Sequence, residues 1–98
     1  MQIDFDAQLW CYQGANPWYF VTVPKEYGEE LKMQSGGERR GFGAIRVSVR
    51  IGQTAWQTSI FPNKDGSYVL PVKAAVRKAE KLTDGDPVTV RLEVEQVG

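Results

Sequence analysis

The sequence predicts a mainly β domain: a small, compact barrel of about six strands with two short helices. Two observations carry this prediction. Apolar and polar residues alternate with a period of two over several segments, which is typical of strands with one buried face. Glycine, proline, asparagine and aspartate separate these segments at short intervals, as turns require.

Each expected strand has its own signal. Alternation is clearest where valine and isoleucine occupy every second position of residues 45–51. Pro24 and Pro71 end two strands because proline donates no ladder hydrogen bond. The glycine-first pair Gly52-Gln53 suits a two-residue hairpin turn. We expect strands over residues 3–9, 18–23, 44–51, 54–61, 67–70 and 88–94.

Two helices are expected, over residues 25–33 and 72–82. In the second, Lys73, Arg77 and Lys81 recur every four residues and therefore share one helix face. Residues 34–43 contain four glycines and two adjacent arginines, and we interpret them as a flexible loop.

The order strand, proline, helix, glycine, strand occurs twice, first from Val21 and again from Tyr68. This order predicts two related halves that close one barrel. Closure would remove the exposed strand edges that invite aggregation.

Length and composition narrow the class of protein. The 98 residues fit a single domain over 1–98, and 42% hydrophobic residues are enough for one core. Twelve basic and twelve acidic residues balance, which argues against a dedicated nucleic-acid binder. A single cysteine and the absence of a signal peptide or long apolar stretch predict a cytoplasmic protein without membrane association.

Residue types also limit the chemistry. The chain has no histidine, which removes the commonest general base and metal ligand, and one cysteine cannot form the usual structural zinc site. We therefore expect no catalytic residue, metal or cofactor. The paired carboxylates Asp4/Asp6, Glu29/Glu30 and Asp84/Asp86 are interpreted as surface and turn residues. An enzyme that uses only carboxylates and arginines is a remaining alternative.

The binding hypothesis rests on cationic side chains and one tryptophan. Arg39 and Arg40, in the glycine-rich loop, have the chemistry to bind phosphate or carboxylate, against the simpler interpretation of solvated loop residues. Trp18, Phe20 and Trp56 are assigned to the core, whereas Trp10 is out of phase with its strand and is the surface candidate. The full set of candidates is Arg39, Arg40, Arg46, Arg50, Lys73, Arg77, Lys78, Lys81 and Trp10.

A series of separated motifs covers nearly the whole chain. They are Trp18-x-Phe20-Val21-x-Val23-Pro24, Gly41-Phe42-Gly43, Trp56-x-Thr58-Ser59-Ile60-Phe61-Pro62, Tyr68-x-Leu70-Pro71-Val72-Lys73, Val76-Arg77-Lys78 and Leu82-x-x-Gly85-Asp86-x-Val88-x-Val90. In this order they resemble the bacterial domain-of-unknown-function family number nineteen hundred and five. The resemblance implies a small double-split β-barrel and no established activity.

A weaker resemblance is confined to the last third. Residues Val76 to Val88 are similar to the helix–turn–strand of AbrB/MazE/MraZ-type swapped-hairpin regulators. Glu80 replaces an apolar residue of that pattern, and the strand before Pro71 carries no arginine, so we take only a fold from it. The function expected is thus a non-enzymatic binding or interaction module, as a monomer or weak homodimer, with a protein or acidic ligand. The alternative is an AbrB-like nucleic-acid-binding regulator.

Overall fold

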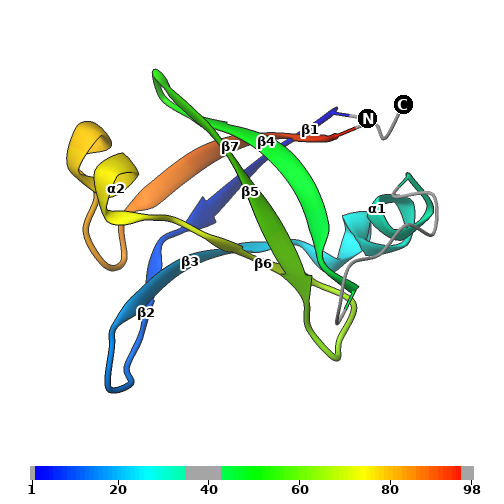
Figure 1. The fold of residues 1–98 in the computed structure, drawn as a ribbon, viewed down its shortest axis with the longest axis horizontal. Coiled ribbons are helices and arrows are strands. Elements are labelled where there is room, and N and C mark those ends of the chain that lie inside the picture. The colour runs from blue at the N-terminus through cyan, green and yellow to red at the C-terminus, as the bar shows by residue number, and fades with distance from the viewer. Residues whose placement is uncertain (1, 35–42, 96–98) are drawn as a thin grey trace.

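A computed structural model describes residues 2–34 and 43–95. The sheet order is β1-β7-β4-β5-β6-β3-β2, and every neighbouring pair is antiparallel (Figure 1). The expected mainly β barrel with two short helices is confirmed. The elements are β1 (Gln2–Gln8), β2 (Trp10–Tyr12), β3 (Trp18–Val23), the 3-10 turn η1 (Lys25–Tyr27), α1 (Gly28–Gln34), β4 (Ile45–Ile51), β5 (Thr54–Pro62), β6 (Tyr68–Pro71), α2 (Ala74–Glu80) and β7 (Pro87–Val94).

The sheet closes into a barrel because β1 and β2 form one nearly continuous piece of chain. This piece pairs with one side of the sheet through β1 and with the other side through β2. Leu9 alone separates β1 from β2, yet β1 pairs with β7 and β2 pairs with β3. At this corner the Leu9 amide donates to the Asp86 carbonyl (2.9 Å), and the Gly85 amide donates to the Leu9 carbonyl (2.7 Å). The Leu9 side chain is fully buried. The short strand β2 was not expected from the sequence, since the alternation stops at Leu9.

The carboxylates beside Gly85 hold this corner. Asp84 accepts a hydrogen bond from the Cys11 amide (3.0 Å), and Asp86 accepts from the amide (2.8 Å) and the hydroxyl (3.1 Å) of Thr83. Gly85 has a φ of 91°, which favours glycine. This aspartate pair therefore acts in turn structure, as the sequence analysis expected.

The strand pairing has the symmetry of two related halves. If β1 and β2 together correspond to β5, β3 to β6, α1 to α2 and β4 to β7, the pairs β3·β6 and β4·β7 each map onto themselves. The pair β1·β7 then maps onto β5·β4, and β2·β3 maps onto β5·β6. The two helices lie on opposite sides of the barrel (Figure 1). The topology therefore agrees with the duplication inferred from the sequence.

The core is built from alternate strand residues and closed by a helix residue on each side. In β7 every second side chain from Val88 to Val94 is buried, and β4 shows the same alternation. Leu31 of α1 and Val76 of α2 add almost fully buried side chains. Aliphatic residues dominate this interior, and Phe5 and Tyr68 are the aromatic residues buried among the described positions.

The helix α2 is shorter than the sequence suggested. Lys73 precedes it as the N-cap, and Lys81 follows it in the left-handed conformation (φ 56°). Two members of the expected lysine–arginine stripe therefore lie at the helix ends. Glu80 stands where the swapped-hairpin pattern has an apolar residue, and the structure gives it a polar role. Its carboxylate accepts a hydrogen bond from the Thr54 hydroxyl (2.5 Å) and so attaches α2 to β5.

The helix α1 approaches the β5–β6 turn more closely than any side chain would permit. A Cβ placed on Gly28 would overlap the backbone carbonyl of Gly66. Gly28 itself is buried in an ordinary helical conformation, so close approach and not φ requires glycine here.

We expect Gly28→Ala to lower the free energy of unfolding by about 1–3 kcal/mol, the usual cost of overpacking. Urea denaturation monitored by circular dichroism measures this change. Glu29→Ala, an exposed change on the same helix, is the control and should alter stability little. Equal stability of Gly28→Ala and the wild type would contradict this packing.

The β5–β6 turn contains a carboxylate with a shifted pKa. The Ser67 hydroxyl and amide both donate to Asp65 (2.6 and 2.9 Å), and these hydrogen bonds lower the pKa of Asp65. Because the folded-state pKa lies below the unfolded value, the stabilisation is present above the unfolded pKa. It is lost as the pH falls through the folded pKa.

We expect Ser67→Ala to raise the pKa of Asp65 toward its ordinary value, since it removes the hydroxyl hydrogen bond that lowers this pKa most. An NMR titration of the Asp65 carboxyl carbon measures the pKa directly. An unchanged Asp65 titration in the variant would show that Ser67 is not the cause.

Candidate binding surface

Strand β3 is apolar on both of its faces. Val21 and Val23 point into the core and are fully buried. Trp18 and Phe20 alternate with them and therefore point outward. Since the barrel has one interior, the second apolar face of this strand is left on the surface.

Neighbouring strands extend this outward face. Tyr12 lies opposite Trp18 in the β2·β3 register, Pro71 lies opposite Phe20, and Phe61 lies opposite Val69. An open apolar groove of about 470 Å³ runs between them, and no charged side chain lines it. We call the whole surface the outer aromatic face: Trp10, Tyr12, Trp18, Phe20, Phe61, Val69 and Pro71.

Three residues of this face are unusually open to solvent. Trp18 is 57% exposed, Tyr12 56% and Phe61 41%. The assignment of Trp18 to the core was therefore wrong. The alternation of residues 18–23 could have indicated the exposure of Trp18, because a strand with two apolar faces cannot bury both of them in so small a barrel.

Trp10 and Phe20 are held in fixed positions behind the exposed rings. The Trp10 and Phe20 ring centroids are 5.0 Å apart, and the Trp10 indole nitrogen donates to the Thr22 hydroxyl (3.0 Å). Phe20 also stacks with Trp18 at 6.3 Å and 11°. Trp10, the predicted surface tryptophan, is thus partly buried and has its polar atom satisfied. The fixed rings preorganise the surface on which Trp18 lies.

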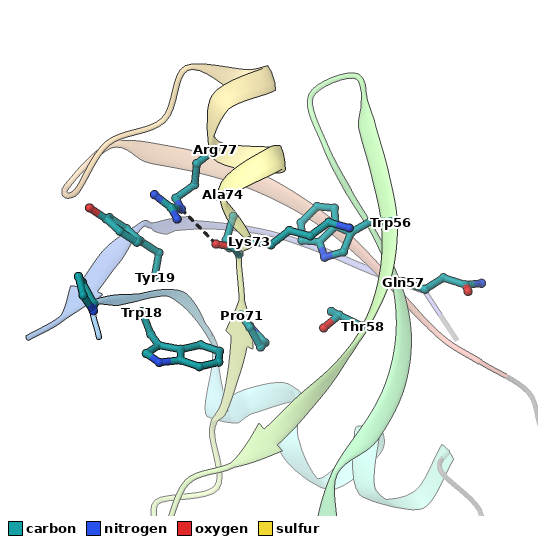
Figure 2. A pocket seen from close by; sticks show the side chains of 11 residues that line it. Trp18, Tyr19, Trp56, Gln57, Thr58, Pro71, Lys73, Ala74 and Arg77 are labelled. Atoms are coloured by element: carbon teal, nitrogen blue, oxygen red, sulfur yellow. Dashed lines mark hydrogen bonds between the residues drawn. The ribbon is translucent and has the colours of Figure 1, made fainter. Parts of the chain in front are cut away.

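A second hollow adjoins this face and has a different chemistry. It has a volume of about 270 Å³ between the start of α2, the start of β3 and the middle of β5. Figure 2 shows Arg77 reaching from α2 toward Tyr19, with Trp56 and Thr58 on the β5 side. We call it the Arg77 pocket, lined chiefly by Trp18, Tyr19, Trp56, Thr58, Lys73 and Arg77.

The Arg77 guanidinium is fixed by two contacts. Its Cζ lies 3.8 Å from the centroid of the Tyr19 ring, and its Nε donates to the Val72 carbonyl (3.2 Å). The Val72 amide in turn donates to the Tyr19 carbonyl (2.9 Å), which joins the start of α2 to β3. Among the described residues no further hydrogen bond or ion pair involves the Arg77 guanidinium. Its two terminal nitrogens remain available to a ligand.

Two more predicted cations, Arg46 and Arg50, lie on β4, which pairs with β7, but they lie among carboxylates. Arg46 lies 3.4 Å from Glu95, and Arg50 lies opposite Arg91, which pairs with Asp4 at 3.0 Å. The outward side of β1, β7 and β4 carries both signs of charge, with three arginines and four carboxylates: Arg46, Arg50, Arg91, Asp4, Asp6, Glu93 and Glu95. These residues therefore form a mixed surface and not a basic one.

The remaining candidates fall into three groups. Lys73 and Arg77 both line the Arg77 pocket, but their side chains extend in opposite directions, Lys73 toward Trp56 and Arg77 toward Tyr19 (Figure 2). Lys78 is exposed on α2 and Lys81 caps it, and neither lines the pocket. Arg39 and Arg40 lie outside the described residues.

The structure adds residues that the sequence analysis did not select. Tyr12, Phe61 and Val69 complete the outer aromatic face, and Tyr19 supports Arg77. Cross-strand pairing brings them together, and a single sequence does not reveal that register. Over residues 2–34 and 43–95, no group of three or more acidic or cysteine side chains could hold a metal ion. The helices in those same ranges are too short and polar to cross a membrane.

Fold and surface together define a small split β-barrel domain with an exposed aromatic sheet face. Comparison with known families gives a more specific result. The family model described as Domain of unknown function (DUF1905) matches residues 5–92, and the chain belongs to this family. No curated protein matches the sequence.

The exposure of Trp18 has a direct spectroscopic consequence. We expect Trp18→Phe to remove most of the acrylamide-quenchable tryptophan fluorescence and to shift the remaining emission to the blue, because Trp10 and Trp56 are partly buried. Trp56→Phe is the matched control and should leave a strongly quenchable signal. Equal quenching of the two variants would contradict the exposed position of Trp18.

Proposed function

We propose that this domain is a non-enzymatic protein-interaction module that binds an extended apolar segment of a partner protein on the outer aromatic face. The observation that carries the proposal is the gathering of Trp18, Tyr12 and Phe61, all well exposed, around one groove. Contiguous apolar patches on soluble domains commonly mark interaction sites, and aromatic residues are enriched at binding hot spots.

The organisation of the face supports binding over a merely incidental exposure. Phe20 is held between Trp10 and Trp18, and the Trp10 indole is fixed by Thr22. Rings that are already ordered lose little conformational freedom when a partner binds, so more of the interaction energy appears as affinity. Tyrosine and tryptophan supply large contact areas at low entropic cost.

The chemistry of the groove favours a polypeptide over nucleic acid. Its lining contains no cation, whereas nucleic-acid binding depends on neutralising phosphates. Aromatic-lined grooves are used to bind extended or proline-rich segments. The single cysteine, Cys11, suits a reducing compartment, and we propose a cytoplasmic location.

A peptide library displayed on phage tests the proposal. We expect selection on the wild-type domain to enrich apolar peptides, and Trp18→Ala to weaken a selected synthetic peptide about thirtyfold, as for a hot spot worth roughly 2 kcal/mol. Met33→Ala is the matched control, because Met33 is 75% exposed on α1 but does not line the groove. Isothermal titration calorimetry measures each affinity, and circular dichroism checks that the variants are folded.

Other results would overturn the proposal. Selected peptides that bind Trp18→Ala and the wild type equally would place the site elsewhere. Sedimentation that shows a homodimer lost in Trp18→Ala would assign the face to a second copy of the chain. Salt-dependent binding of a single-stranded oligonucleotide, lost in the same variant, would favour the nucleic-acid alternative.

A further inference from the structure

We infer that the Arg77 pocket is a carboxylate-binding subsite, which receives an acidic side chain of the segment bound on the outer aromatic face. The inference deepens the proposed function and rests on it for the identity of the ligand. It would make the partner sequence an apolar stretch with a glutamate or aspartate beside it.

The charge of the Arg77 pocket favours an anionic ligand. Lys73 and Arg77 both line it, and no acidic side chain is among the lining residues. By contrast, Arg46 and Arg91 on the mixed surface each have a carboxylate within hydrogen-bonding reach. Arg50 also lacks an ion-pair partner among the described residues, but it is exposed on the outside of β4 and lines no described hollow. Two cations without a counter-charge in one hollow attract an anion.

The orientation of the Arg77 guanidinium favours a carboxylate in particular. Tyr19 fixes its plane and Val72 occupies its Nε, so the edge formed by the two terminal nitrogens remains. Such an edge matches the two oxygens of a carboxylate and binds it through paired, charge-assisted hydrogen bonds. A guanidinium already held on a ring loses little freedom when the carboxylate binds.

The walls of the Arg77 pocket connect it to the apolar groove that would hold the rest of the ligand. The pocket walls include Trp18 and Trp56, and its volume of about 270 Å³ suits one small group and not a large charged one. Trp18 and Pro71 line both this pocket and the apolar groove. A single ligand can therefore place apolar groups in the groove and a carboxylate beside Arg77.

Phenylacetate is a suitable probe because it combines an aromatic ring with one carboxylate. We expect it to shift the NMR signals of the Arg77 Nε–H and of the Trp18 and Trp56 indole N–H groups saturably. Phenylacetamide, which has the same shape without charge, should bind about tenfold more weakly or worse, because hydrogen bonds to charged groups are the stronger ones. Phenyl phosphate is compared to distinguish a carboxylate site from a phosphate site.

Variants of Arg77 separate the effect of its paired hydrogen-bond geometry from the effect of its charge. Arg77→Gln should abolish the saturable shifts, and Arg77→Lys should weaken binding about tenfold because it keeps the charge but loses the paired geometry. Lys78→Gln is the control, since Lys78 is exposed on the same helix and does not line the pocket. Equal binding of phenylacetate and phenylacetamide, or unchanged binding by Arg77→Gln, would overturn the subsite. Tighter binding of phenyl phosphate would assign the pocket to phosphate and overturn it too.

The selected peptides distinguish failure of the subsite from failure of the proposed function. Peptides whose affinity falls about tenfold when a glutamate becomes glutamine, but not when the C-terminus is amidated, support the acidic side chain. Peptides insensitive to the glutamine change would overturn the subsite and leave the interaction module intact. Saturable phenylacetate binding without any selected peptide would support carboxylate recognition and remove the protein partner.

Discussion

The corner at Leu9 is the constraint on which the rest of the molecule depends. One buried residue, hydrogen-bonded through its amide and carbonyl to Asp86 and Gly85, allows a continuous piece of chain to pair with β7 on one side and with β3 on the other. Without this bend, β2 would leave the sheet, and β3 would lose its neighbouring strand. Backbone hydrogen bonds at this corner therefore help to bring the two ends of the sheet together.

Closure of so short a chain leaves a narrow interior, and aliphatic side chains fill most of it. Val21, Leu70 and Leu92 are fully buried, whereas Trp18 and Tyr12 remain outside. Keeping large rings in water costs stability, since burying apolar area is the main favourable contribution to folding. Such residues are typically retained where a partner covers them. The loss of stability and the proposed binding surface thus have the same origin, which is that both faces of β3 are apolar.

The fold was largely predictable because its signals are local. Alternation, residue composition and turn signals located six strands, Pro24 and Pro71 marked strand ends, and the repeated order of elements indicated two halves. The site was less predictable because it depends on register. The four-residue spacing predicted that Lys73 and Arg77 share one side of a helix, but nothing local indicates that Tyr19 would support Arg77 or that Phe61 would lie near Trp18. The short strand β2 was not predicted for the same reason, since its three residues form a strand only by pairing with β3.

The internal symmetry has an evolutionary consequence. The Arg77 pocket lies between the start of α2 and the start of β3. The symmetry places its counterpart between the start of α1 and the start of β6, where Gly28 packs directly on the Gly66 carbonyl. After a duplication, the two copies of this junction would have diverged in charge and not in openness, because the counterpart also has a hollow, of about 440 Å³. Its lysines, Lys25, Lys32 and Lys64, share that hollow with the carboxylates Glu29 and Asp65, whereas no acidic side chain lines the Arg77 pocket. One half of the molecule thus supplies its own counter-charges at this junction, and the other does not.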